Sequence, residues 1–170
     1  MLNRQAKPEL ALLLQIIDEA FDKKAWHGPN LRGCIRRLEV EEAVWRPAPG
    51  RHNIWEIVVH TAYWKYIVRR RLLGEKRGSF VLKGSNWFDR PVTKSAQAWR
   101  AEVQLLEETH RQMRAAIAAM NPADLHETPP GSKVSNAALI SGIAAHDIYH
   151  AGQIQVLKRL ARGGLADGSE

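Results

Sequence analysis

Apolar residues recur every three or four positions over four long stretches of the chain, which is the period of α-helices that bury one face. We expect these helices at about residues 8–26, 54–73, 94–120 and 136–162, with two shorter helical turns at 31–38 and 41–44. No stretch shows a convincing alternation of the kind that marks a strand. The pattern predicts an all-α four-helix bundle in one domain, residues 1–162, followed by a flexible C-terminal tail at 163–170.

Capping residues indicate where several of these helices begin. Asn53 and Glu56 have the spacing of a capping box, in which each side chain accepts a hydrogen bond from the other residue's backbone. Thr93 and Ser135 are expected to cap the third and fourth long helices, and Asn30 the first short one.

Two connections are too long for a simple series of up-and-down helical hairpins. One joins the first and second long helices, and the other joins the second and third. The latter contains Trp87 and Phe88, two large apolar residues that either cover an edge of the bundle or line a substrate pocket.

Three histidines lie on the apolar faces of two predicted helices. His146 and His150 are four residues apart, so they project from one side of the last helix, and His60 lies on the apolar face of the second long helix. Three neutral imidazoles from two helices form a ligand set that leaves metal positions open, as in a catalytic site. The alternative is that all three are ordinary core histidines with hydrogen-bond partners.

Two segments carry a resemblance to a known family. The segment 45–60, WRPAPGRHNIWEIVVH, followed by Trp64 and Lys65, resembles the DinB/YfiT-like superfamily, and so does HDIYHAGQI at 146–154. The likeness extends over roughly residues 8–161. It implies a four-helix bundle with unusual crossing connections.

The resemblance also implies a chemistry. The corresponding positions of the family bind a divalent metal, which carries over here to His60, His146 and His150. The family includes metalloenzymes that activate a low-molecular-weight thiol cofactor, adding it to electrophiles or using it in isomerisation. Its members commonly form homodimers.

Three readings of the function follow. The first is a metal-dependent enzyme, a thiol-dependent S-transferase or isomerase acting on small electrophilic substrates. The second is a non-catalytic stress-response or binding protein with a structural metal. The third is a hydrolase that uses a metal-bound hydroxide. Imidazole ligands suit zinc, nickel or iron, and also copper.

Further polar and aromatic residues fall near the three histidines. Trp64, one turn beyond His60, is a candidate wall of a cofactor or substrate pocket. Gln153, three residues after His150, either hydrogen-bonds a bound ligand or water or links two helices. His110 is a fourth inward histidine on the third long helix, with a role in the core, beside the site or at a subunit contact.

The composition of the chain restricts the cofactors and binding partners that we expect for it. Cys34 is the only cysteine and lies off the histidine faces, so a reactive thiol should come from a small cofactor. The net charge of +7 suits a carboxylate-bearing thiol, but the basic residues are dispersed, which argues against nucleic acid. No apolar run resembles a signal peptide or membrane span, so we expect a cytoplasmic protein that does not bind membranes. The six tryptophans and several loop aromatics favour a homodimer.

Overall fold

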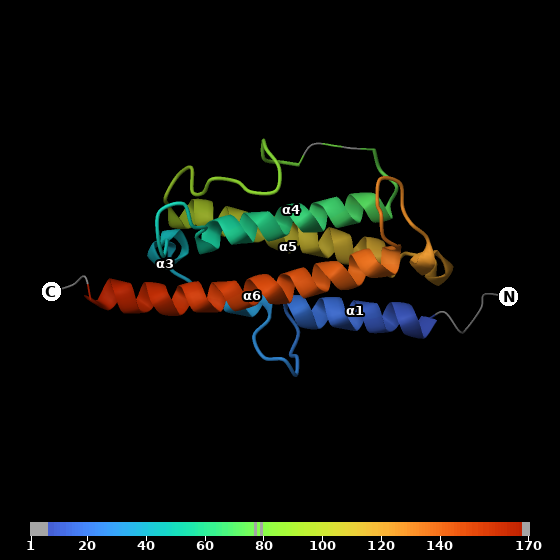
Figure 1. Ribbon diagram of the computed structural model, residues 1–170, viewed down its shortest axis with the longest axis horizontal. Coiled ribbons are helices and arrows are strands. Elements are labelled where there is room, and N and C mark those ends of the chain that lie inside the picture. Colours follow the sequence, from blue (N-terminus) through green and yellow to red (C-terminus); the bar gives the residue numbers. More distant parts are fainter. Residues whose placement is uncertain (1–6, 77, 79, 168–170) are drawn as a thin grey trace.

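The structure is a computed structural model that describes residues 7–76, 78 and 80–167 (Figure 1). Every regular element in these ranges is a helix, which confirms the predicted all-α class. The elements are α1 (Lys7–Phe21), α2 (Leu31–Cys34), α3 (Val40–Val44), α4 (Ile54–Leu72), α5 (Ala96–Ala118), the 3-10 helix η1 (Pro122–His126) and α6 (Asn136–Asp167).

The four longest helices lie side by side with an unusual order of directions (Figure 1). Helices α4 and α5 run in the same direction, and the connection 73–95 between them crosses back along the length of the molecule. Helices α1 and α6 run together in the opposite direction, with α1 along the first part of α6. The long second connection is therefore what allows α4 and α5 to pack in parallel.

Two expected helix ends near the N-terminus were wrong. Helix α1 ends at Phe21, not near Trp26, because the carbonyl of Asp18 accepts from the backbone N–H of both Asp22 and Lys23 and so closes the last turn. The side chain of Trp26 is fully exposed, so no packing extends the helix to it. The first short helix stops at Cys34, with Ile35 as its C-cap, and the left-handed φ of 57° at Arg37 excludes the expected extension to residue 38.

Two later helix boundaries also differ from the expected ones. Ser95, not Thr93, caps α5, since its Oγ accepts from the N–H of Ala98 at 3.1 Å. Helix α6 starts after Ser135 as predicted but continues to Asp167, through most of the expected tail, and residues 168–170 lie outside the described part. Burial of Ala161 and the ion pair between Arg162 and Glu42 hold this end of α6 against α3.

The core consists of two apolar clusters, one at each end of the bundle. The first half of α4 is buried on all sides, because α3, α5, α6 and the connection 73–95 cover it. Phe80 and Phe88 from that connection belong to this cluster, so Phe88 covers an edge of the bundle. The second cluster joins α1, α5 and the start of α6 around Ile17, Met113 and Ile140.

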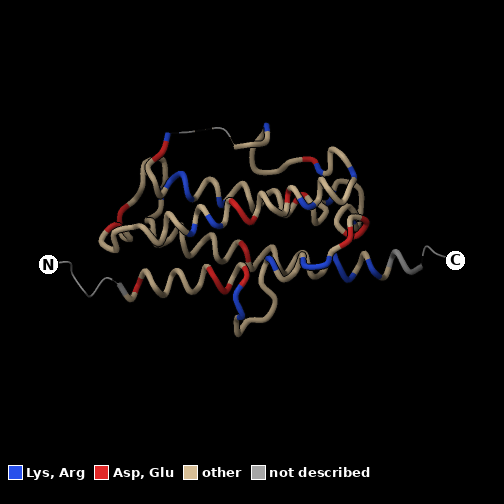
Figure 2. The backbone as a smooth tube through the Cα atoms, turned by 180° about the vertical axis from the view of Figure 1, so that it is seen from behind, with Lys and Arg blue, Asp and Glu red and all other residues tan. Residues whose placement is uncertain are grey.

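Charged residues are spread over several elements. Figure 2 shows lysines and arginines distributed over several helices and connections, with acidic residues among them. None of the described helices combines the length and the apolar character needed to cross a bilayer.

Candidate metal centre

The three predicted histidines meet between α4 and α6. The capping box of Asn53 and Glu56 starts α4, as expected from the sequence, and His60 follows in its second turn. The Nε2 atom of His146 lies 3.1 Å from the Nε2 of His60 and 3.1 Å from that of His150. One ligand atom from each of the three residues lies within 4.8 Å of the other two. The structure thus brings together one imidazole from α4 and two from α6.

The hydrogen bonds of the outer ring nitrogens determine whether each inner nitrogen presents a lone pair or a proton to the middle of the cluster. The Nδ1–H of His60 donates to the carbonyl of Asn86 at 2.8 Å, and that of His150 donates to Oε1 of Gln153 at 2.7 Å. Both partners are acceptors, so each ring carries its proton on Nδ1 and directs an Nε2 lone pair inward. The Nδ1 of His146 is buried and has no partner among the described residues.

All three imidazoles are held neutral. Burial lowers the pKa of His60. Burial, aided by the neighbouring His150 and His60, lowers the pKa of His146 to about 3. Burial, aided by the neighbouring His60, lowers the pKa of His150 to about 4. Neutral imidazole is the form that binds a divalent metal.

This donor set fits a divalent ion. The Nε2 lone pairs of His60 and His150 both point at the Nε2 of His146 at 3.1 Å, and a single proton on that nitrogen satisfies only one of them, whereas a cation between the three rings would satisfy all three nitrogens. Metal–nitrogen bonds of about 2.0–2.1 Å place neighbouring ligands of a tetrahedral ion about 3.3 Å apart, close to the observed separation. In the described ranges no further histidine, cysteine or carboxylate joins the cluster, so other coordination positions are free for a ligand.

Two tryptophans lie against the histidines. Trp87 stacks on His60 with ring centroids 3.9 Å apart, and its other face stacks on His52 at 3.6 Å. Trp64 meets His60 and His146 edge-on, with centroids 6.4 Å apart, and donates its Nε1–H to Oδ1 of Asn86 at 2.9 Å. Of the two loop aromatics, Trp87 therefore belongs to the site, while Phe88 belongs to the core.

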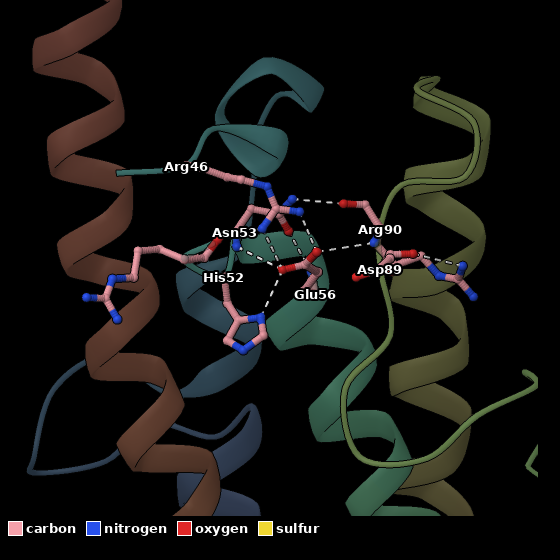
Figure 3. A network of polar contacts seen from close by, with 7 residues as sticks. Arg46, His52, Asn53, Glu56, Asp89 and Arg90 are labelled. Atoms are coloured by element: carbon pink, nitrogen blue, oxygen red, sulfur yellow. Dashed lines mark hydrogen bonds and ion pairs between the residues drawn. The ribbon is translucent and has the colours of Figure 1, made fainter. Parts of the chain in front are cut away.

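A buried carboxylate holds the loops around this stack in place (Figure 3). Glu56 accepts hydrogen bonds from both Nη atoms of Arg46, from Nδ1 of His52 at 3.0 Å and from the backbone N–H of Arg90 at 3.3 Å. Burial opposes ionisation of Glu56, but these hydrogen bonds outweigh it and hold its pKa below the usual value. The amide of Asn53 also donates to the carbonyl of Arg90 at 2.9 Å. The network ties residues 46–53 and 86–90 to the start of α4.

Sequence reasoning missed the two loop residues that shape the site. Asn86 contributes a carbonyl to His60 and a side chain to Trp64, from a left-handed φ of 63°. Asparagine is one of the few residues other than glycine that adopt this conformation readily, which is the one local signal available. The stacking of His52 on Trp87 has no sequence signal, because 35 residues of numbering separate the two in different loops.

A buried ion pair between the two ligand-bearing helices was also missed. Lys65 of α4 donates to Asp147 of α6, and their side chains are 0% and 1% exposed. Asp147 therefore faces away from the metal ligands, as expected from its place next to His146 in the sequence. The lysine also lies 5.0 Å over the ring of Phe21.

His110 lies outside the cluster. Its ring stacks on Phe21 at 3.6 Å, and its Nδ1 is buried without a partner among the described residues. Burial, with the charges of Lys65 and Arg114, lowers the pKa of His110 to about 2. It is therefore a neutral core histidine here.

Two pockets open beside the histidines. One, of about 670 Å³, is lined by two parts of the segment before α4 (47–48 and 51–52), by Ile57 and Trp87, and by the face of α6 that carries Gly152, Gln153, Val156 and Leu157. The other, of about 170 Å³, is lined by His146, Trp64 and Arg71 among others. Gln153 lines the larger pocket while it binds His150, so it reaches both the ligand set and the pocket.

A comparison with protein families finds a match over most of the chain. The profile described as DinB superfamily matches residues 25–154, a span that contains all three converging histidines, Glu56 and both pockets' tryptophans. Neither the search of curated proteins nor that of solved structures gave a match.

Proposed function

Because the chain belongs to the DinB superfamily, we propose that it is a metal-dependent transferase that joins a low-molecular-weight thiol to a small electrophile. In this proposal His60, His146 and His150 hold one divalent ion, with zinc, nickel and iron as the ions best suited to imidazole and copper as a further one. The observation that carries the proposal is the convergence of three neutral Nε2 atoms beside an open pocket.

The chain's own residues prepare this chemistry. Asn86 and Gln153 fix the protons of His60 and His150 on their outer nitrogens, which keeps the inner lone pairs available. Trp64 and Trp87 pack against the ligands and limit the access of water to them. A divalent ion bound there would lower the pKa of a coordinated thiol and so favour the nucleophilic thiolate.

The thiol is proposed to come from outside the chain. Cys34, the only cysteine in the sequence, is completely buried, and its Sγ–H donates to the carbonyl of Ala151 at 3.5 Å. Burial raises the pKa of this thiol, so Cys34 is a poor nucleophile.

The experiment supplies protein loaded with each metal in turn with a panel of cellular thiols and a chromogenic electrophile. The expected result is a rate above background with at least one thiol, lost in His150→Ala. It should be retained in Cys34→Ala and in His126→Ala, which changes an exposed histidine at the end of η1. Equal rates for wild type and His150→Ala across the panel would contradict the transferase proposal and favour a metal protein without this activity.

A further inference from the structure

The pocket of about 670 Å³ beside the metal centre has the size of a small-molecule site. Two of its lining residues also touch the histidine cluster, since Trp87 stacks on His60 and Gln153 binds His150. A molecule in this pocket would therefore be separated from the three histidines by the side chains of Trp87 and Gln153. Both faces of the Trp87 indole are covered by His52 and His60, so such a molecule would meet the edge of that ring.

Most of the lining is apolar. Ile57 and Leu157 form buried parts of the wall, and Val156 on α6 is 57% exposed. A valine side chain left this exposed loses contact with water when a ligand with an apolar body covers it. The apolar lining therefore calls for a carbon-rich ligand.

The charged and titratable lining residues are Arg51 and His52, and no lining residue is acidic. The nearby Arg46 and Arg90 are neutralised by Glu56 and Glu102, whereas the guanidinium of Arg51 has no ion pair in the described part of the chain. An unneutralised guanidinium at the edge of an apolar pocket is suited to a carboxylate or a similar anion.

His52 is oriented toward the same ligand. Its Nδ1 is engaged by Glu56 and its ring is fixed on Trp87, so the direction of its Nε2 is set. Figure 3 shows this second nitrogen pointing away from the Glu56 network. With the proton of the neutral ring on Nδ1, this Nε2 is an acceptor without a partner in the ranges that the structure describes, so it suits an N–H or O–H of the ligand and not its anionic group.

From these observations we infer that the pocket binds a small organic anion. Its apolar body packs on Ile57, Val156 and Leu157, and its anionic group meets the guanidinium of Arg51. That this anion is the electrophilic substrate rests on the proposed function, but its binding does not, because none of these contacts involves the metal.

The test uses two fluorescent probes with the same ring system, anilinonaphthalene sulfonate and the uncharged phenylnaphthylamine, titrated into the full chain after chelator treatment. The sulfonate probe is expected to bind at one site and about tenfold more tightly than the neutral one, the difference that one charge-assisted hydrogen bond makes. Val156→Glu, at an exposed position, should weaken both probes and the anionic one more.

Matched charge variants locate the anionic group. Arg51→Gln should remove most of the preference for the sulfonate probe while leaving the neutral probe unchanged. Arg159→Gln removes the same charge from an exposed position of α6 outside the pocket and should have no effect. Equal affinities for the two probes in wild type, or equal effects of the two arginine variants, would overturn the inference.

Further outcomes separate this inference from the proposed function. Probe binding that survives in His60→Ala while metal binding and activity are lost supports the pocket independently of the metal. Transferase activity without probe binding would overturn the pocket and leave the transferase standing. Probe binding that increases as a dimer dissociates on dilution would assign this face to a second copy of the chain, which also overturns it.

Discussion

Replacing Lys65 by methionine should destabilise the protein by about 3–5 kcal/mol, the usual cost of removing one partner from a buried ion pair. This ion pair is almost completely shielded from water, because the Lys65 and Asp147 side chains are 0% and 1% exposed. The second carboxylate oxygen of Asp147 has no hydrogen-bond partner among the described residues, so the substitution leaves this carboxylate without its one cation.

The double variant Lys65→Met/Asp147→Leu should regain most of that loss, because apolar side chains of similar volume avoid the cost of burying two charges. Urea unfolding of the chelator-treated protein, followed by circular dichroism, gives the free energies of unfolding for a double-mutant cycle. The control is Glu75→Gln, in a partly exposed pair with Arg69, where a change of about 0–1 kcal/mol is expected. A loss below about 1 kcal/mol for Lys65→Met, or additive single effects, would refute the reasoning.

Three further predictions concern metal affinity, the pH dependence of stability and the oligomeric state. Gln153→Leu removes the acceptor that orients His150 and should weaken metal binding about 10- to 100-fold in a chelator competition, whereas an unchanged affinity would contradict this role. The unfolded chain binds a proton at His110 below about pH 6.5, but the folded protein does not until about pH 2, so this residue costs stability as the pH falls. Between pH 7 and 5, His110→Leu should therefore lose about 2 kcal/mol less unfolding free energy than wild type in urea titrations, and equal losses would argue against it. Light scattering coupled to gel filtration should find a homodimer, for which exposed Leu12, Ile148 and Leu160 on α1 and α6 offer apolar surface, and a monomer at about 10 µM would count against it.

Local patterns in the sequence are sufficient for much of the fold. The helical periods predict the four long helices, and the capping box at Asn53 predicts the start of α4 within one residue. The positions of His60, His146 and His150 on apolar faces predict their convergence, because a helix face buried against a neighbour brings its residues together.

The parts that could not be predicted depend on contacts distant in the sequence. A lysine beside Trp64 is expected at a surface, and only the approach of Asp147 on α6 explains its burial. Near Arg162, α6 is held against α3 by the ion pair with Glu42, a contact 120 residues away in the sequence that no local pattern indicates. The wall formed by Trp87 and His52 arises from the Glu56 network, which joins three separate segments.

The most direct test of the central claim is the metal content of protein purified without an affinity tag or a nickel column. Elemental analysis, followed by titration of the chelated protein with zinc, nickel and iron, gives the stoichiometry and affinity for wild type and variants. The account predicts one divalent ion per chain, retained in His126→Ala and lost in His60→Ala, His146→Ala and His150→Ala while helicity is preserved. Full occupancy in the His60→Ala variant would contradict it.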